Sequence, residues 1–321
     1  MTWNRLLDLL IGLAALISAL AFVGAIYQVI ATRLSERKYP PPGRLVDVGG
    51  YRLHIHCSGP EDAPGGPTVV MDAGIGECSL GWSLVQPEVA QFARVCTYDR
   101  AGLGWSDSAP TARTSQQIVD ELHALLAHAG IESPYVMVGH SFGGVNVRLY
   151  ASRFPEEVAG LVLVDSAHED HPIRLPLYIR LGLLTARLGI PRLFARFVAY
   201  ENPIFAVDSK YPPAYKAVAT STKYLKTVRR EWSEVEESWS QARRSMKSLG
   251  DRPLVVLLAT FDDELFPVIR KLETELANRS TEGQLIMVEQ SGHHIQHDRP
   301  DTVIDAVREV VEAVRHKTVG V

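Results

Sequence analysis

A serine enclosed by glycines is the residue of this sequence best suited to covalent chemistry. Ser141 is the central residue of a Gly-His-Ser-Phe-Gly pentapeptide at 139–143. An apolar run at 135–138 precedes the pentapeptide, and a helical apolar pattern at 145–154 follows it. A sharp turn between a strand and a helix exposes a serine hydroxyl at the positive end of the helix, as a nucleophile elbow requires. We therefore predict that Ser141 is a nucleophile.

A serine hydroxyl reacts only when a base removes its proton, so a histidine must reach it from elsewhere in the chain. His293 follows Ser291-Gly292 in a predicted turn after the last apolar run, and we predict that it is the base. The neighbouring His294 is the alternative. A metal site made of His293, His294 and His297 is disfavoured because no matching acidic ligand accompanies them, and we expect neither a metal nor a cofactor.

A third residue, an acid, must hold the histidine in the correct tautomer. Asp263 follows the apolar run at 254–259 and lies between the serine and the histidine in chain order, so it is the favoured candidate. Asp165 ends the apolar run at 161–164 and is the second candidate, and Asp262 is the third. The choice among them stays open at this point.

Two backbone amides are expected to bind the oxyanion of an acyl-transfer reaction. One is the amide of Phe142, directly after the candidate nucleophile. The other must come from the first loop after a core strand, where the glycine-rich segment at 71–76 makes the amide of Ile75 the best candidate. Because the chain has neither a G-x-x-x-x-G-K-[ST] nor a G-x-G-x-x-G sequence, nucleotide binding is not expected.

The elements that would position these residues repeat one theme, a short apolar strand followed by a helix. Several of the strands are apolar on both faces, which predicts a mostly parallel, doubly wound α/β sheet covered on both sides. A hairpin at 45–56, with a Gly-Gly turn, precedes them. The predicted strands are 68–71, 94–98, 135–138, 160–164, 254–258 and 285–288, and the predicted helices are 115–129, 145–154, 268–277 and 302–315.

The domain organisation follows from where this alternation begins and breaks. Residues 1–39 form a membrane anchor and linker, and Pro40 to Gly43 is a stiff connection to the soluble part. The core is expected at 40–167 and 252–321. The segment 168–251 has no convincing buried strand and is too long for a simple loop, so we predict a helical cap there.

The N-terminal segment predicts a single-pass membrane helix. No charged side chain occurs from Leu9 to Thr32, and about 20 apolar residues suffice to cross a bilayer. A cleaved signal peptide is the alternative, although its apolar region is usually shorter. Arg33, Arg37 and Lys38 follow the span, which weakly favours a cytoplasmic position for the remainder of the chain.

Composition excludes several other classes. The 321 residues are 46% hydrophobic and 22% charged, with a formal net charge of -4, as in an ordinary folded protein. The sequence has no basic run interleaved with aromatic residues, so a nucleic-acid partner is not indicated. The three cysteines, Cys57, Cys78 and Cys96, have no C-x-x-C spacing and are odd in number, so we expect buried, reduced thiols.

The sequence resembles the α/β-hydrolase superfamily over about 43–315, in particular its bacterial, membrane-anchored, esterase-like members. The resemblance rests on Asp-Ala-Gly-Ile-Gly at 72–76, the segment from Tyr98 to Ser106, the serine pentapeptide, and Ser-Gly-His at 291–293 followed by Asp-Arg-Pro at 298–300. In this superfamily the second of these is a structural turn beside the pocket, so Asp99 and Arg100 are not assigned to catalysis. Two departures are Asp72-Ala73, where many relatives have His-Gly, and Thr260, where relatives often have glycine three residues before the acid.

The resemblance implies acyl transfer without a cofactor. A serine at the elbow favours hydrolysis of a carboxylic ester, whereas superfamily members that hydrolyse epoxides or haloalkanes use aspartate there. Alternatives on the same residues are an amide, peptide or carbon-carbon bond hydrolase and an acyltransferase; a ligand-binding protein without catalysis is an alternative of another class. The expected partners are a small or hydrophobic acyl substrate and the membrane, and the sequence leaves the oligomeric state open.

Overall fold

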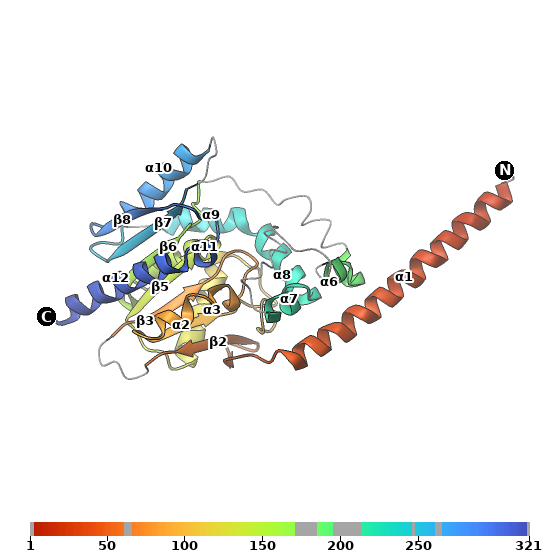
Figure 1. Cartoon of the computed structure of the whole chain (residues 1–321), viewed down its shortest axis with the longest axis horizontal. Helices are drawn as coiled ribbons and strands as arrows, with labels where there is room; N and C mark the ends of the chain where they lie inside the picture. Colours follow the sequence, from red (N-terminus) through yellow and green to blue (C-terminus); the bar gives the residue numbers. More distant parts are fainter. Residues whose placement is uncertain are drawn as a thin grey trace.

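The fold is built on a twisted sheet that is parallel in its larger part (Figure 1). The computed structural model describes residues 3–60, 66–170, 185–194, 213–245, 248–260 and 265–319. The strand order in the sheet is β1-β2-β4-β3-β5-β6-β7-β8, and only the pairings of β1 with β2 and of β2 with β4 are antiparallel. The strands are β1 (Arg44–Asp47), β2 (Arg52–Ser58), β3 (Thr68–Asp72), β4 (Val95–Tyr98), β5 (Tyr135–His140), β6 (Val158–Val164), β7 (Leu254–Ala259) and β8 (Gly283–Val288).

Helices cover both faces of the sheet, because β3 to β7 are apolar on both sides. On one face, side chains of α3 (Ser115–His128), α4 (Phe142–Arg153) and α10 (Phe266–Ala277) join the core. On the other face, α2 (Gln86–Val89), α11 (Ile295–Asp298) and α12 (Pro300–Val319) contribute a valine-rich core. Short 3-10 helices are η1 (Ser79–Trp82) and η2 (Pro155–Glu157).

The predicted alternation of strands and helices is confirmed, as is the hairpin, which corresponds to β1 and β2. The boundaries at the serine pentapeptide differ from the predicted ones. There β5 continues to His140 and α4 begins at Phe142, so that Ser141 alone separates strand from helix. The predicted doubly wound α/β fold is therefore the observed one.

Helices fill the described part of the chain between β6 and β7, as expected of an insertion. They are η3 (Ala186–Leu188), α6 (Ile190–Phe194), α7 (Pro213–Ala219), α8 (Thr222–Ser233) and α9 (Val235–Ser245). Two of them pack onto the core: Trp239 of α9 lies against the ring of Phe142, and α8 packs beside Leu103. The insertion thus lies over the carboxyl edge of the sheet.

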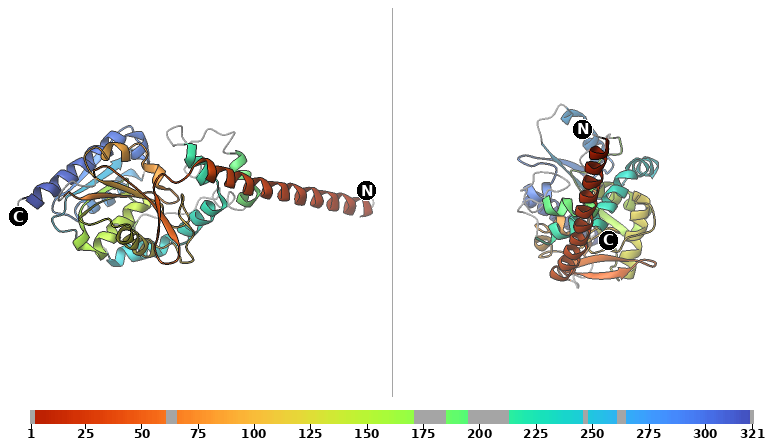
Figure 2. Two further views of the ribbon diagram at one scale, coloured as in Figure 1. Left: turned by 90° about the horizontal axis from the view of Figure 1, so that it is seen from below. Right: turned by 90° about the vertical axis from the view of Figure 1, so that its right-hand side faces the viewer.

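The N-terminal helix α1 (Trp3–Lys38) projects from the domain as a long arm (Figures 1 and 2). It contains one candidate membrane span by length and composition, Leu7–Lys38. A helix of 36 residues is about 54 Å long, more than the about 30 Å of a bilayer core. Its C-terminal part contacts the insertion, where the buried Gln28 Nε2 donates to the carbonyl of Thr220 at 2.9 Å and Arg192 Nη1 donates to Ser35 Oγ at 3.0 Å.

The expectation of three reduced thiols is wrong for two of them. Cys57 of β2 and Cys96 of β4 form a disulfide, with their Cα atoms 4.0 Å apart. The two cysteines are 39 residues apart in sequence but face each other in the antiparallel register of β2 and β4. Because cysteine spacing does not reveal strand register, the pair could not be found by counting. Cys78 is buried and is not part of a disulfide.

Candidate functional site

The serine pentapeptide folds into a strained turn at the centre of the sheet. Ser141 has φ 51° and ψ -117°, a conformation that costs energy for a residue with a side chain and that clusters at functional sites. A Cβ atom at Gly139 would lie 2.6 Å from the backbone of Gly144, and one at Gly143 would lie 2.3 Å from the carbonyl oxygen of Asp72. The glycines therefore let strand, helix and the neighbouring loop approach closely around the serine.

The turn lies where the strand order reverses. β3 pairs with β4 on one side and with β5 on the other, so the loops after β3 and β5 diverge above the sheet edge. In open α/β sheets such a switch point forms the crevice that binds ligands. The loop after β3 carries Ile75, and the turn after β5 carries Ser141.

The candidate base meets an acid at the same edge of the sheet. His293 Nδ1 lies 2.6 Å from Asp165 Oδ2, and Asp165 follows the last residue of β6. Asp165 has φ 40°, and its second oxygen accepts from the backbone N–H of Ala259 at 3.0 Å. The histidine side chain is half exposed while the aspartate is nearly buried. This orientation of the carboxylate is therefore fixed from both sides.

His293 is also connected to the serine turn. His140, directly before Ser141, lies with its Nε2 atom 2.9 Å from the carbonyl oxygen of His293, and the two rings are 4.7 Å apart at their centroids. The His293 imidazole therefore lies beside the residue that precedes Ser141. Asp263 and Asp262 lie outside the described residues, so among the predicted acids the structure brings Asp165 to the histidine.

His294, the alternative base, has a carboxylate of its own. Its Nε2 atom lies 3.1 Å from Glu77 Oε1, and His140 Nδ1 lies 3.0 Å from Glu77 Oε2. Burial raises the pKa of Glu77, but the two histidines outweigh burial and hold it well below its usual range. Burial lowers the pKa of His294, yet the hydrogen bond and charge of Glu77 raise it on balance. Burial lowers the pKa of His140 despite Glu77.

The predicted oxyanion donors lie on the two loops of the switch point. Phe142 is the first residue of α4, and the amides of a first helical turn have no partner within the helix. In the loop after β3, the amide of Gly74 donates to Glu77 Oε2 at 2.9 Å and that of Gly76 donates to Glu231 Oε2 at 2.7 Å. Between them, the amide of Ile75 has no acceptor among the described residues.

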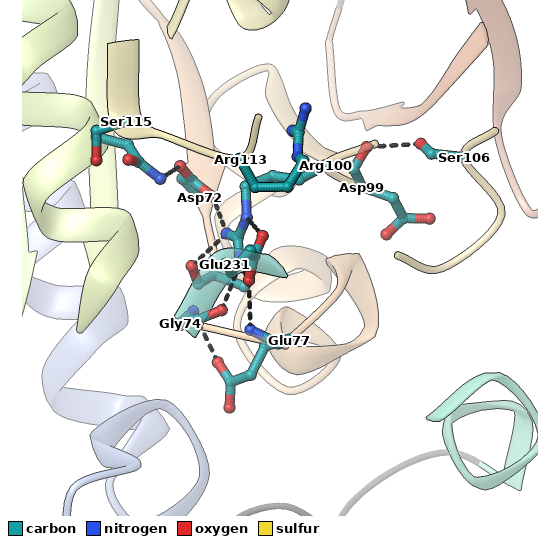
Figure 3. A network of polar contacts seen from close by, with 12 residues as sticks. Asp72, Gly74, Glu77, Asp99, Arg100, Ser106, Arg113, Ser115 and Glu231 are labelled. Atoms are coloured by element: carbon teal, nitrogen blue, oxygen red, sulfur yellow. Dashed lines mark hydrogen bonds and ion pairs between the residues drawn. The ribbon is translucent and has the colours of Figure 1, made fainter. Parts of the chain in front are cut away.

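A buried charge network lies under this loop (Figure 3). Arg100, on the turn after β4, donates to Asp72 Oδ1 at 2.6 Å and to Glu231 Oε1 at 2.7 Å. Asp99, its neighbour, accepts from the amides of Ser79 at 2.7 Å and Trp105 at 2.9 Å and so holds the turn itself. The aspartate thus has the structural role that the sequence resemblance implied.

The family is decided by a sequence model of the alpha/beta hydrolase fold that matches residues 67–300. This match contains the loop after β3, the serine turn, Asp165 and His293. The chain belongs to the α/β-hydrolase family. Together with the fold, this places it among hydrolases.

Individual relatives of this α/β-hydrolase differ in what they are named for. A probable transporter, efuK, of Hormonema carpetanum is 31% identical over 255 residues; the match covers 76% of this chain but only 35% of that protein. A putative lipase from Acinetobacter baumannii has a TM-score of 0.65 at 16% identity, with 89% of this chain and 97% of that chain covered. The epoxide hydrolase CorEH has a TM-score of 0.64 at 17% identity, with 84% and 98% covered. At these identities the two structures show the fold alone.

Some site residues of this α/β-hydrolase could not be read from the sequence. No sequence pattern points to Glu77 or Glu231, and the resemblance implies only a structural turn at Arg100. Arg100 and Glu231 are 131 residues apart, so no local pattern joins them. One local signal was available for Glu77, which follows Gly74 by three residues in a loop expected to bind an anion. A carboxylate in such a loop must point away from the anion.

Proposed function

We propose that this α/β-hydrolase is a serine hydrolase that cleaves carboxylic esters through an acyl-enzyme. The observation that carries the proposal is Ser141 in its strained turn, with His293 beside His140 at the same sheet edge. Asp165 is proposed as the acid in place of Asp263, because its 2.6 Å contact occupies the Nδ1 atom that an acid must orient. His293 is proposed as the base over His294, which is paired with Glu77.

The proposed mechanism passes one proton through His293 in acylation and a second one in deacylation. His293 takes the hydroxyl proton of Ser141 as the oxygen attacks the ester carbonyl, and Asp165 stabilises the imidazolium. The amides of Ile75 and Phe142 bind the oxyanion of the tetrahedral intermediate. Its collapse expels the alcohol, which receives the proton from His293. Water, deprotonated by the same histidine, then attacks the acyl-enzyme, and a second collapse returns the proton to Ser141 and releases the acid.

The residue at the elbow favours esters over the chemistry of the structural neighbour CorEH. Epoxide and haloalkane hydrolysis in this family are expected to begin with a carboxylate nucleophile, whereas this chain has a hydroxyl at the turn. An ester, once attacked by a serine, leaves an acyl group that water can remove. Amide or carbon-carbon bond hydrolysis and acyl transfer to an alcohol use the same residues, and a substrate panel separates them.

The anchor helix favours a hydrophobic substrate. We propose that α1 holds the chain at a membrane by its candidate span, and that residues 168–251 act as a cap, with the core at 40–167 and 252–321. Because Gln28 and Arg192 tie α1 to the insertion, the cap would lie close to the bilayer surface. A neighbour described as a putative lipase is consistent with such a substrate.

The proposal is tested with nitrophenyl esters of increasing acyl length, using the full chain in detergent. We expect turnover that is abolished in Ser141→Ala and unchanged in Ser233→Ala, which removes an exposed hydroxyl on α8. Acyl chains of eight or more carbons are expected to react faster than acetate. A folded wild-type protein without turnover on any ester would reject the ester proposal, and turnover retained in Ser141→Ala would reject the nucleophile.

A further inference from the structure

The loop that carries Ile75 is held by side chains on both sides of its peptide groups. Arg100 Nη1 donates to the carbonyl of Ala73 at 2.6 Å, and Arg100 Nη2 donates to the carbonyl of Gly74 at 2.6 Å. Glu77 and Glu231 accept from the amides of Gly74 and Gly76, as described above. A single guanidinium thus binds two successive carbonyl groups directly before Ile75.

The contacts of the Gly74 carbonyl determine the direction of the Ile75 N–H, the proposed oxyanion donor. In a planar trans peptide the C=O and N–H bonds point in opposite directions. The carbonyl of Gly74 and the amide of Ile75 belong to one peptide group, so the Ile75 N–H points away from the guanidinium of Arg100. Rotation of this group would exchange N–H for C=O and present an oxygen to the oxyanion. A glycine at 74 offers little resistance to that rotation.

Arg100 is itself fixed by a residue of the insertion. Glu231 of α8 is fully buried and binds Arg100 through two contacts, Nε to Oε1 at 2.7 Å and Nη2 to Oε2 at 3.2 Å. The guanidinium carbon also lies 5.7 Å from the ring centroid of Phe142, the residue of the second proposed donor. Burial lowers the pKa of Arg100, but Glu231 and Asp72 raise it well above its ordinary value, so the side chain stays charged.

We propose that Arg100 is a positioning residue that holds the Gly74–Ile75 peptide with its N–H toward the oxyanion. In this proposal Glu231, a residue of the insertion, holds Arg100 in place. The inference rests on the serine-hydrolase function proposed above. It assigns a catalytic consequence to a residue whose motif indicated only a structural turn. It also makes α8 part of the proposed catalytic architecture, because the Glu231 carboxylate that binds Arg100 (Figure 3) also accepts from the Gly76 amide.

The test uses Arg100→Lys, which keeps the charge but cannot bind two carbonyls and a carboxylate in one plane. The matched control is Arg113→Lys, because Arg113 is equally buried and donates to both oxygens of Glu121, at 2.6 and 2.7 Å. Kinetics of a nitrophenyl ester and binding of a boronic acid, which forms a tetrahedral adduct with the serine, are measured for each.

Loss of one oxyanion donor typically lowers kcat about 100-fold to 1000-fold. We expect Arg100→Lys to lose about 100-fold in kcat and in boronic acid affinity, with KM within about threefold, because the oxyanion exists only after attack. Arg113→Lys should retain kcat within about threefold even when its melting temperature falls. Glu231→Gln, which keeps the shape of the side chain, is expected to lose about tenfold in kcat and serves if Arg100→Lys does not fold.

The outcomes separate this inference from the function on which it rests. If the wild type turns over esters and the Arg100 and Glu231 variants match Arg113→Lys in kcat, the positioning role is refuted and the hydrolase proposal stands. The positioning role would also be refuted if Arg100→Lys changed only KM, or if it weakened the binding of substrate and of boronic acid by the same factor. If the wild type neither turns over esters nor binds the boronic acid, both proposals are refuted.

Discussion

Replacing Asp165 with asparagine tests whether Asp165, and not Asp263, is the acid of the proposed triad. The carboxylate accepts from Ala259 N–H with one oxygen and contacts His293 Nδ1 with the other. In Asp165→Asn the amide oxygen must stay on Ala259, because the reverse orientation would set the NH2 group against a buried N–H at a cost of about 1–3 kcal/mol. The NH2 group therefore faces His293, and the imidazole must accept at Nδ1.

An imidazole that accepts at Nδ1 carries its proton on Nε2 and cannot take a proton from Ser141. The same exchange in a serine protease triad lowers kcat by a factor on the order of 10⁴. That factor corresponds to a barrier about 5 kcal/mol higher. We expect a loss of this order in kcat for Asp165→Asn, with KM within a few-fold because both carboxylate oxygens face Ala259 and His293.

The assay is steady-state hydrolysis of a nitrophenyl ester by wild type, Asp165→Asn and Asp263→Asn. The melting temperature and the far-UV circular dichroism of each variant establish that it is folded. Asp263→Asn is expected to keep kcat within about threefold. The reasoning is refuted if Asp165→Asn retains more than a tenth of the wild-type kcat, and doubly so if Asp263→Asn then loses a factor on the order of 10³.

Three further predictions concern stability and topology. The His294–Glu77 pair stabilises the fold while His294 is protonated; since folding raises the pKa of His294, the free energy of unfolding lost in His294→Gln should be largest below pH 6.5 and shrink as pH rises through the raised pKa, and a pH-independent loss in chemical denaturation would contradict this. Reducing the Cys57–Cys96 disulfide, which closes a 39-residue separation, should cost about 4 kcal/mol of unfolding free energy, and the Cys57→Ala, Cys96→Ala double variant should melt at one temperature with or without reductant. Because disulfides persist in oxidising compartments, Cys57 and Cys96 should not react with a thiol reagent in cells lysed with that reagent under denaturing conditions; two reactive thiols at these positions would support the cytoplasmic side favoured by the flanking charges.

The fold was predictable because its signals are local. Strands such as β7 are short apolar runs, and the turn at Ser141 needs glycines in fixed places because chain segments approach there within van der Waals distance. The order serine then histidine, each after a strand, sufficed to predict that both lie at one sheet edge, since parallel strands end at the same edge.

The missing parts of the site depend on distances that no local pattern encodes. In the sequence, Asp165 and Asp263 each follow an apolar strand, and the sequence does not show which one meets His293. Cys57 and Cys96 depend on strand register, and Glu231 depends on how α8 packs over the core. Each of these is a tertiary contact between two segments, and the local pattern of either segment does not indicate its partner.

The central claim, that Ser141 is an activated nucleophile, is tested most directly by locating a covalent adduct. The full chain in detergent is treated with a fluorophosphonate, digested, and analysed by tandem mass spectrometry. We expect a phosphonyl group on Ser141, absent in Ser141→Ala and formed far more slowly in Asp165→Asn. The claim would be contradicted if folded wild-type protein formed no adduct. An adduct on another serine that persists in Ser141→Ala would also contradict it.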